Sequence, residues 1–137
     1  MDTEKIKDLL YKPAPDHSRV ELMAAKCMKA AFIEISKDVT TKISKIDRLT
    51  SGVQLLDKCL QVIQCCQRAN LCKDHKRRES YLEEAYFNVC DISTILGIYV
   101  ESRIITVERY GVLGELVGKV ASTLHKEIKS CNQISWK

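Results

Sequence analysis

The chain has 137 residues, of which 45% are hydrophobic, 6% aromatic and 29% charged, with a formal net charge of +4. This length predicts one domain with a core of aliphatic side chains, and the basic balance permits a nucleic-acid or acidic protein partner. No apolar run reaches the length of a membrane span, and the polar start Met1-Asp2-Thr3-Glu4-Lys5 is unlike a signal peptide, so we expect a cytoplasmic protein.

Residues 1–17 are predicted to form an N-terminal arm outside the core. The arm contains a short amphipathic piece, which Pro13 and Pro15 end because each proline disfavours helix at the residue before it. No proline follows Pro15, so the rest of the chain lacks the strongest helix breaker.

Four helices are predicted over residues 18–42, 47–71, 75–102 and 107–131, because apolar residues recur there at spacings of three and four. The first stripe is Met28, Phe32, Ile35, Val39 and Ile43. The second is Leu49, Val53, Leu56, Leu60 and Ile63, widened by Leu55, Cys59, Val62 and Cys66. The third is Leu82, Ala85, Val89, Ile92, Leu96 and Tyr99, and the fourth is Tyr110, Leu113, Val117, Val120, Leu124, Ile128 and Cys131.

Polar residues mark the starts of two of these helices. Ser44, with Asp47 three residues later, is a capping pair before the second helix, and Thr106 can cap the fourth. Residues 132–137 are predicted to be a flexible tail. Short connectors between four helices favour antiparallel neighbours, so the predicted domain at residues 18–131 is an all-α, antiparallel up-and-down four-helix bundle.

The connector between the second and third helices concentrates positive charge. Five cations lie within eleven residues that contain a single acid, Asp74. They are Arg68, Lys73, Lys76, Arg77 and Arg78, which we call the basic corner. Long cations at a connector can bind phosphates through charge-assisted hydrogen bonds, so these are the candidate nucleic-acid-binding residues. The alternative is that they only keep a turn solvated.

Gly111, Gly114 and Gly118 lie inside the fourth helical pattern. Each glycine costs about 1 kcal/mol relative to alanine in a helix interior, so this spacing predicts a face that another backbone approaches closely. The approach could occur within the bundle or between subunits. The wide apolar stripes of the second and third helices also predict a partner subunit, since one bundle has one interior.

The sequence carries no pattern typical of a metal site, a cofactor site or a catalytic centre. Cys65, Cys66, Cys72 and His75 contain zinc-ligand atoms, but they form no Cys-x-x-Cys and match no structural spacing. The chain also lacks a Glu-x-x-His, a P-loop, a dinucleotide fingerprint and a nucleophile elbow. We therefore predict no metal, no cofactor and no enzymatic activity.

The seven cysteines are predicted to be reduced. Most of them occupy apolar positions of the helical patterns, where a thiol behaves as a small hydrophobic group. In particular, Cys59, Cys66 and Cys90 are expected to be buried thiols that are not bonded to one another.

Several stretches resemble one family of small bacterial four-helix-bundle proteins. They are Ile-Gln-Cys-Cys-Gln-Arg-Ala-Asn at 63–70, Lys76-Arg77-Arg78, Tyr-Leu-Glu-Glu-Ala at 81–85, Ile-Thr-Val-Glu-Arg-Tyr at 105–110, and Gly118-Lys119. The resemblance covers roughly residues 24–129. One branch of the family is encoded in intervening sequences of bacterial large-subunit ribosomal RNA genes, and the other comprises accessory variability determinants of diversity-generating retroelements.

The retroelement branch is favoured by Ala69-Asn70 and the basic run that follows it before Tyr81. This resemblance implies a homopentameric ring of basic bundles that binds RNA or an RNA/DNA hybrid and assists an error-prone reverse transcriptase. It also implies that the basic corner contacts nucleic acid or an acidic polymerase surface. The alternatives are a ribosomal intervening-sequence protein, or a purely structural or protein-interaction bundle.

Overall fold

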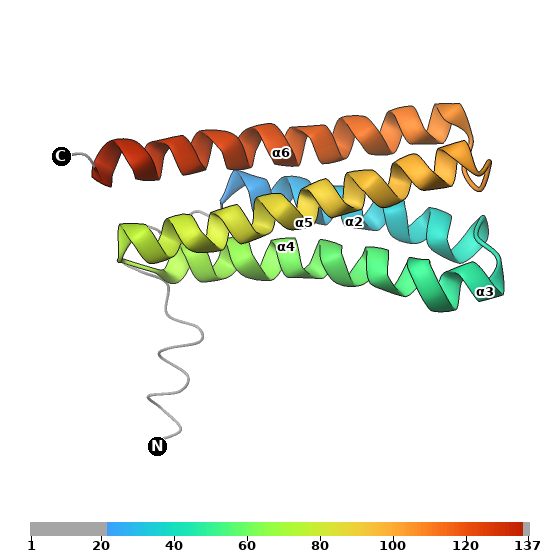
Figure 1. The fold of residues 1–137 in the computed structure, drawn as a ribbon, viewed down its shortest axis with the longest axis horizontal. Coiled ribbons are helices and arrows are strands. Elements are labelled where there is room, and N and C mark those ends of the chain that lie inside the picture. The colour runs from blue at the N-terminus through green and yellow to red at the C-terminus, as the bar shows by residue number, and fades with distance from the viewer. Residues whose placement is uncertain (1–21, 136–137) are drawn as a thin grey trace, which may run out of the picture.

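The structure, a computed structural model, describes the backbone of residues 22–135 and the side chains of residues 22–131 (Figure 1). Its elements are α2 (Met23–Thr41), α3 (Lys45–Asp47), η2 (Arg48–Gly52), α4 (Val53–Leu71), α5 (His75–Glu101) and α6 (Val107–Ser135). None of the described residues is in a strand, and the predicted all-α, antiparallel four-helix bundle is confirmed. The arm at 1–17 and the predicted start of the first helix at residues 18–21 lie outside the described residues.

The four long helices form a closed ring of neighbours, in which α4 packs on α5, α5 on α6, α6 on α2 and α2 on α4. Figure 1 shows the α4–α5 connector and the C-terminal end of α6 at one end of the bundle. The α5–α6 connector and α3 lie at the opposite end. The basic corner is therefore at the same end as the last turns of α6.

Both predicted caps are present. The Ser44 hydroxyl accepts a hydrogen bond from the Asp47 backbone N–H at 3.2 Å and donates one to the Asp47 carboxylate at 2.9 Å. The Thr106 hydroxyl accepts from the Arg109 backbone N–H at 3.1 Å. Each such cap contributes about 1 kcal/mol because it satisfies a backbone donor that has no partner within the helix. At the other end of α6, no proline or glycine follows Gly118, and the helix continues to Ser135, beyond the predicted end at residue 131.

The core contains the whole predicted third stripe, from Leu82 to Tyr99, and most of the first and fourth. In the second helix, however, the prediction named the wrong main face. The buried face is Leu55, Cys59, Val62 and Cys66, whereas Leu49, Val53 and Leu60 are 66%, 54% and 43% exposed.

The physical reason is tertiary packing: α4 carries two apolar faces, and the one that lies against α2 and α5 is buried. The helix begins after η2, a π-helical turn between α3 and α4. A π turn holds one more residue than an α turn, so it rotates the side chains before it around the helix axis. The turn therefore affects the position of Leu49, whereas the exposure of Val53 and Leu60 depends on the packing of α4 alone. The Ser51 and Tyr99 hydroxyls are hydrogen-bonded at 2.6 Å and tie the π turn to α5.

Candidate nucleic-acid interface

The basic corner begins where α4 ends and α5 starts. Arg68, Lys73, Lys76 and Arg77 are exposed, as a site for phosphates requires. Asp74, the acid of this connector, caps α5 and accepts a hydrogen bond from the Lys76 backbone N–H at 3.2 Å. Its carboxylate is therefore committed to the helix start.

The first turn of α5 carries cations and no acid. This reverses the usual preference, because the N-terminus of a helix has a partial positive charge that stabilises acids and disfavours Lys and Arg. Lys76 and Arg77 thus lower helix stability slightly, while their charge adds to that of the backbone N–H groups there. The resulting positive field favours an anion beside this turn.

Arg78 differs from the other members of the corner. Its side chain is 14% exposed, and its guanidinium lies 3.7 Å from the Glu127 carboxylate of α6. It connects α5 to α6, so its charge is partly neutralised within the bundle. The pairing needs the register of two helices, which the sequence pattern did not provide.

Charge is distributed unequally between the two ends of the bundle. The Lys58–Asp91 ion pair joins α4 to α5 at 3.0 Å and lies part of the way along both helices, where we divide the bundle. We define the corner half as residues 22–31, 60–90 and 118–131, and the far half as residues 32–59 and 91–117. The corner half holds ten Lys and Arg against five Asp and Glu, and the far half seven against eight. Within residues 22–131, the whole positive excess therefore lies in the corner half.

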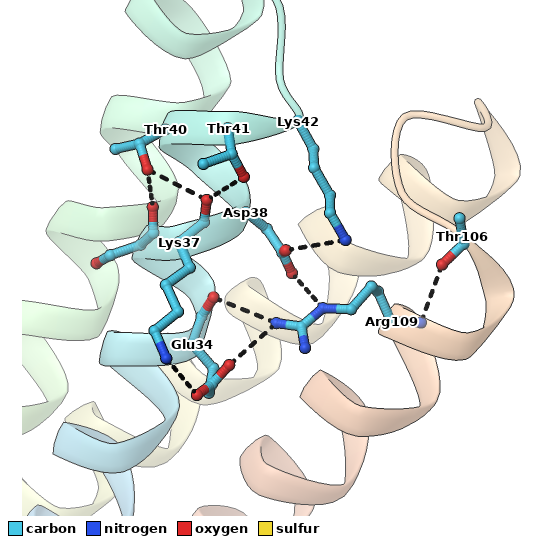
Figure 2. Close-up of polar contacts among 9 residues, drawn as sticks. Glu34, Lys37, Asp38, Thr40, Thr41, Lys42, Thr106 and Arg109 are labelled. Carbon is cyan, nitrogen blue, oxygen red and sulfur yellow. Dashed lines mark hydrogen bonds and ion pairs between the residues drawn. The ribbon is translucent and has the colours of Figure 1, made fainter.

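The charges of the far half largely neutralise one another, as Figure 2 shows between α2 and α6. Arg109 donates to the Asp38 carboxylate at 3.0 Å and to the Glu34 carboxylate at 3.2 Å. Lys42 lies 3.5 Å from Asp38, and Lys37 lies 3.0 Å from Glu34. Hydrogen bonds from Lys37 and then Arg109 lower the pKa of Glu34, which keeps this carboxylate ionised.

Sequence reasoning quoted Arg109 within a motif but missed its role. Asp38, its main partner, is 4% exposed and lies 71 residues earlier. The available signal was the spacing of four between Glu34 and Asp38, which places both acids on one side of α2. That spacing does not identify the cation that they bind.

Gly111, Gly114 and Gly118 are exposed on α6. A Cβ added at any of the three would meet no atom within 4 Å. Close packing within the bundle therefore does not explain these glycines. Their role in an interface between subunits stays a prediction.

An apolar stripe runs along the exposed side of α3, η2 and α4. Its large side chains are Ile46, Leu49, Val53 and Leu60, with Ile46 77% exposed. Several large apolar side chains exposed along one segment are typical of protein–protein contacts. The outer α4 stripe, as we call these four residues, is the structural counterpart of the surplus apolar surface seen in the sequence.

The cysteines within residues 22–131 are all free thiols. Cys59 and Cys66 are buried as predicted, and burial raises the pKa of Cys59 to about 12. The prediction was wrong for Cys90, which is exposed because its neighbour Val89 occupies the core-facing position of α5. Among the described side chains, no three His, Cys, Asp or Glu gather in a way that could hold a metal ion.

None of the described helices combines the length and the apolar composition of a membrane span. Comparisons with protein-family models, with curated proteins and with solved structures find no match to this chain. Three features of the bundle bear on its function: a corner half with excess positive charge, a neutralised far half and an outer apolar stripe.

Proposed function

We propose that this chain is a non-catalytic, nucleic-acid-binding accessory protein of a diversity-generating retroelement, which assists an error-prone reverse transcriptase in the cytoplasm. The observation that carries the nucleic-acid part is the excess of ten cations over five anions in the corner half. The reverse-transcriptase part comes from the resemblance of residues 63–85 and 105–110 to the accessory variability determinants.

Electrostatics favour RNA or an RNA/DNA hybrid at the basic corner. Each Lys or Arg that neutralises a phosphate releases condensed counterions, and this term supplies most of non-specific nucleic-acid affinity. Arg68, Lys73, Lys76 and Arg77 are exposed and close together in sequence, so their side chains can follow one strand. Such contacts position a strand without reading its sequence.

Binding of labelled RNA and of an RNA/DNA hybrid, measured by fluorescence anisotropy, tests this function. The expected dissociation constant at physiological salt is about 1–100 µM per bundle, the range of non-specific binding, and it should vary little with base sequence. Absence of binding at low salt would refute the nucleic-acid role. A reverse-transcriptase gene beside this one would support the retroelement branch, whereas a surrounding ribosomal RNA gene would support the intervening-sequence branch.

We further propose that the bundle forms a homo-oligomer through the outer α4 stripe, with the pentamer implied by the resemblance as the expected state. Replacing Leu49 and Val53 together by Lys should dissociate the oligomer, because two charges would have to be buried at the subunit contact. Sedimentation measures this directly. Wild-type protein that sediments only as a 15.6 kDa monomer at micromolar concentration would contradict the proposal.

The outer α4 stripe also favours a second candidate function, a protein-interaction bundle whose cations serve solubility alone. On this alternative, RNA affinity is weak and insensitive to the basic corner. Loss of a protein partner on changing Leu49, with RNA binding absent, would favour it over the first proposal.

A further inference from the structure

A groove lies on the outer surface between α5 and α6, two neighbouring helices in Figure 1. It is a shallow depression of about 490 Å³ that is largely open to solvent. Its lining residues are Tyr86, Gly118, Ala121, Ser122, His125 and Lys126. We call it the α5–α6 groove, and all of its lining residues belong to the corner half.

The lining is mainly apolar, and it combines an aromatic ring and bare backbone with a few polar groups. Tyr86 supplies the ring, and at Gly118 the α6 backbone has no side chain between it and the groove. Lys126 and His125 supply hydrogen-bond donors, and no acid lines the groove. A flat nucleic-acid base, with apolar faces and polar edges, fits this lining, and Lys126 can contact a neighbouring phosphate.

The groove adjoins the basic corner. The Arg78–Glu127 ion pair joins the first turn of α5 to the residue that follows Lys126. Along α5, Arg78 and Tyr86 are eight residues apart, or about 12 Å at the rise of an α-helix and about 80° around its axis. A single strand bound at the basic corner can therefore extend past Arg78 towards the groove.

We propose that the α5–α6 groove holds an unpaired base of the RNA strand whose phosphates bind the basic corner. The inference rests on the proposed nucleic-acid function and gives it a ligand class, single-stranded RNA. Aromatic side chains stack on bases of any sequence, and RNA is read mainly where its bases are unpaired. The groove thus predicts a preference for single-stranded over duplex RNA without base specificity.

Gly118→Leu is the sharpest test, because the new side chain fills the groove without a clash at its Cβ and has a higher helix propensity than glycine. Tyr86→Leu removes the ring and keeps an apolar side chain. The matched controls are Gly111→Leu, which also has open space at the Cβ on α6, and Tyr110→Leu, both outside the groove. Both groove variants should weaken binding of a short oligouridylate by about 5- to 150-fold, while the controls should not.

A second oligonucleotide, with the same number of phosphates but an abasic nucleotide at every position, completes a thermodynamic cycle of protein variant against RNA base. The groove variants should bind this abasic oligomer as the wild type does, since only base contacts are lost. Equal weakening for both oligomers, or Gly118→Leu and Tyr86→Leu that bind like their controls, would overturn the proposal. The proposal would also be overturned if Gly118→Leu changed the sedimentation of the protein and Tyr86→Leu did not. That result would assign Gly118 to a contact between subunits.

The same measurements distinguish a failure of the nucleic-acid function from a failure of the groove as a base site. Wild-type protein that binds neither oligomer overturns the nucleic-acid function and the groove together. Wild-type binding that falls with salt and with changes at Lys76 and Arg77, but not with changes at Gly118 and Tyr86, overturns the groove alone.

Discussion

Replacing Arg109 by Leu should lower the free energy of unfolding by about 2–4 kcal/mol, measured by chemical denaturation. The substitution leaves Asp38 buried without the guanidinium that contacts it at 3.0 Å. The expected loss is smaller than that for a fully buried pair because the Arg109 side chain remains 24% exposed and Lys42 still lies 3.5 Å from Asp38. Helical content by circular dichroism confirms that the variant folds.

Lys42→Ala is the matched control, because it removes a more exposed cation from the same carboxylate. It should cost less than about 1 kcal/mol, as surface ion pairs do. Equal costs for the two variants would contradict the structural role assigned to Arg109.

Lowering the pH should reduce the difference in the free energy of unfolding between the wild type and Arg109→Leu. The pKa of Glu34 is lowered from its ordinary value of 4.5 by hydrogen bonds from Lys37 and Arg109. A lowered pKa contributes stability that is present above the ordinary value and lost as the pH falls through the folded-state value. The free energies of unfolding of the two proteins, measured as a function of pH, should therefore approach each other below pH 4.5.

Reversing two charges of the basic corner, with Lys76→Glu and Arg77→Glu together, should weaken RNA binding by about 10- to 100-fold at physiological salt. Two phosphate contacts would be replaced by repulsion. The same change should leave the fold intact or slightly more stable, because acids are favoured in the first turn of a helix. If the double variant binds RNA more weakly and is as stable as the wild type, the loss of affinity is not caused by unfolding.

The matched control reverses Lys45 and Arg103, two exposed cations of the far half. This control changes the net charge of the chain by the same amount. If both double variants lost equal affinity, total charge would govern RNA binding and the corner would have no special role. Anisotropy titrations of the three proteins with one RNA decide the question.

Local features of the fold could be predicted from the sequence. The third stripe, from Leu82 to Tyr99, became the core face of α5 because one helix carried a regular apolar pattern. The caps at Ser44 and Thr106 formed because a hydroxyl and a backbone N–H three residues away meet by local geometry. Four of the five corner cations are exposed, which was also predictable because long charged side chains at a connector stay in water.

Features that depend on packing between helices could not be predicted in this way. The outer α4 stripe and the buried face of α4 both have apolar spacing, and the packing of α4 on α2 and α5 decides which of them is buried. The pairing of Arg78 with Glu127 depends on which residues of α5 and α6 lie opposite each other. The α5–α6 groove also requires that register, since Tyr86 and Gly118 meet only in the folded bundle.

The salt dependence of RNA affinity tests the central claim most directly, because it counts phosphate contacts. A plot of log affinity against log salt should be linear for the wild type, with a slope of about −0.7 for each contact to a single strand. For the Lys76→Glu/Arg77→Glu protein the slope should be shallower by about 1.4, and for the Lys45→Glu/Arg103→Glu protein it should equal that of the wild type. Identical slopes for all three proteins would contradict a nucleic-acid interface at the basic corner.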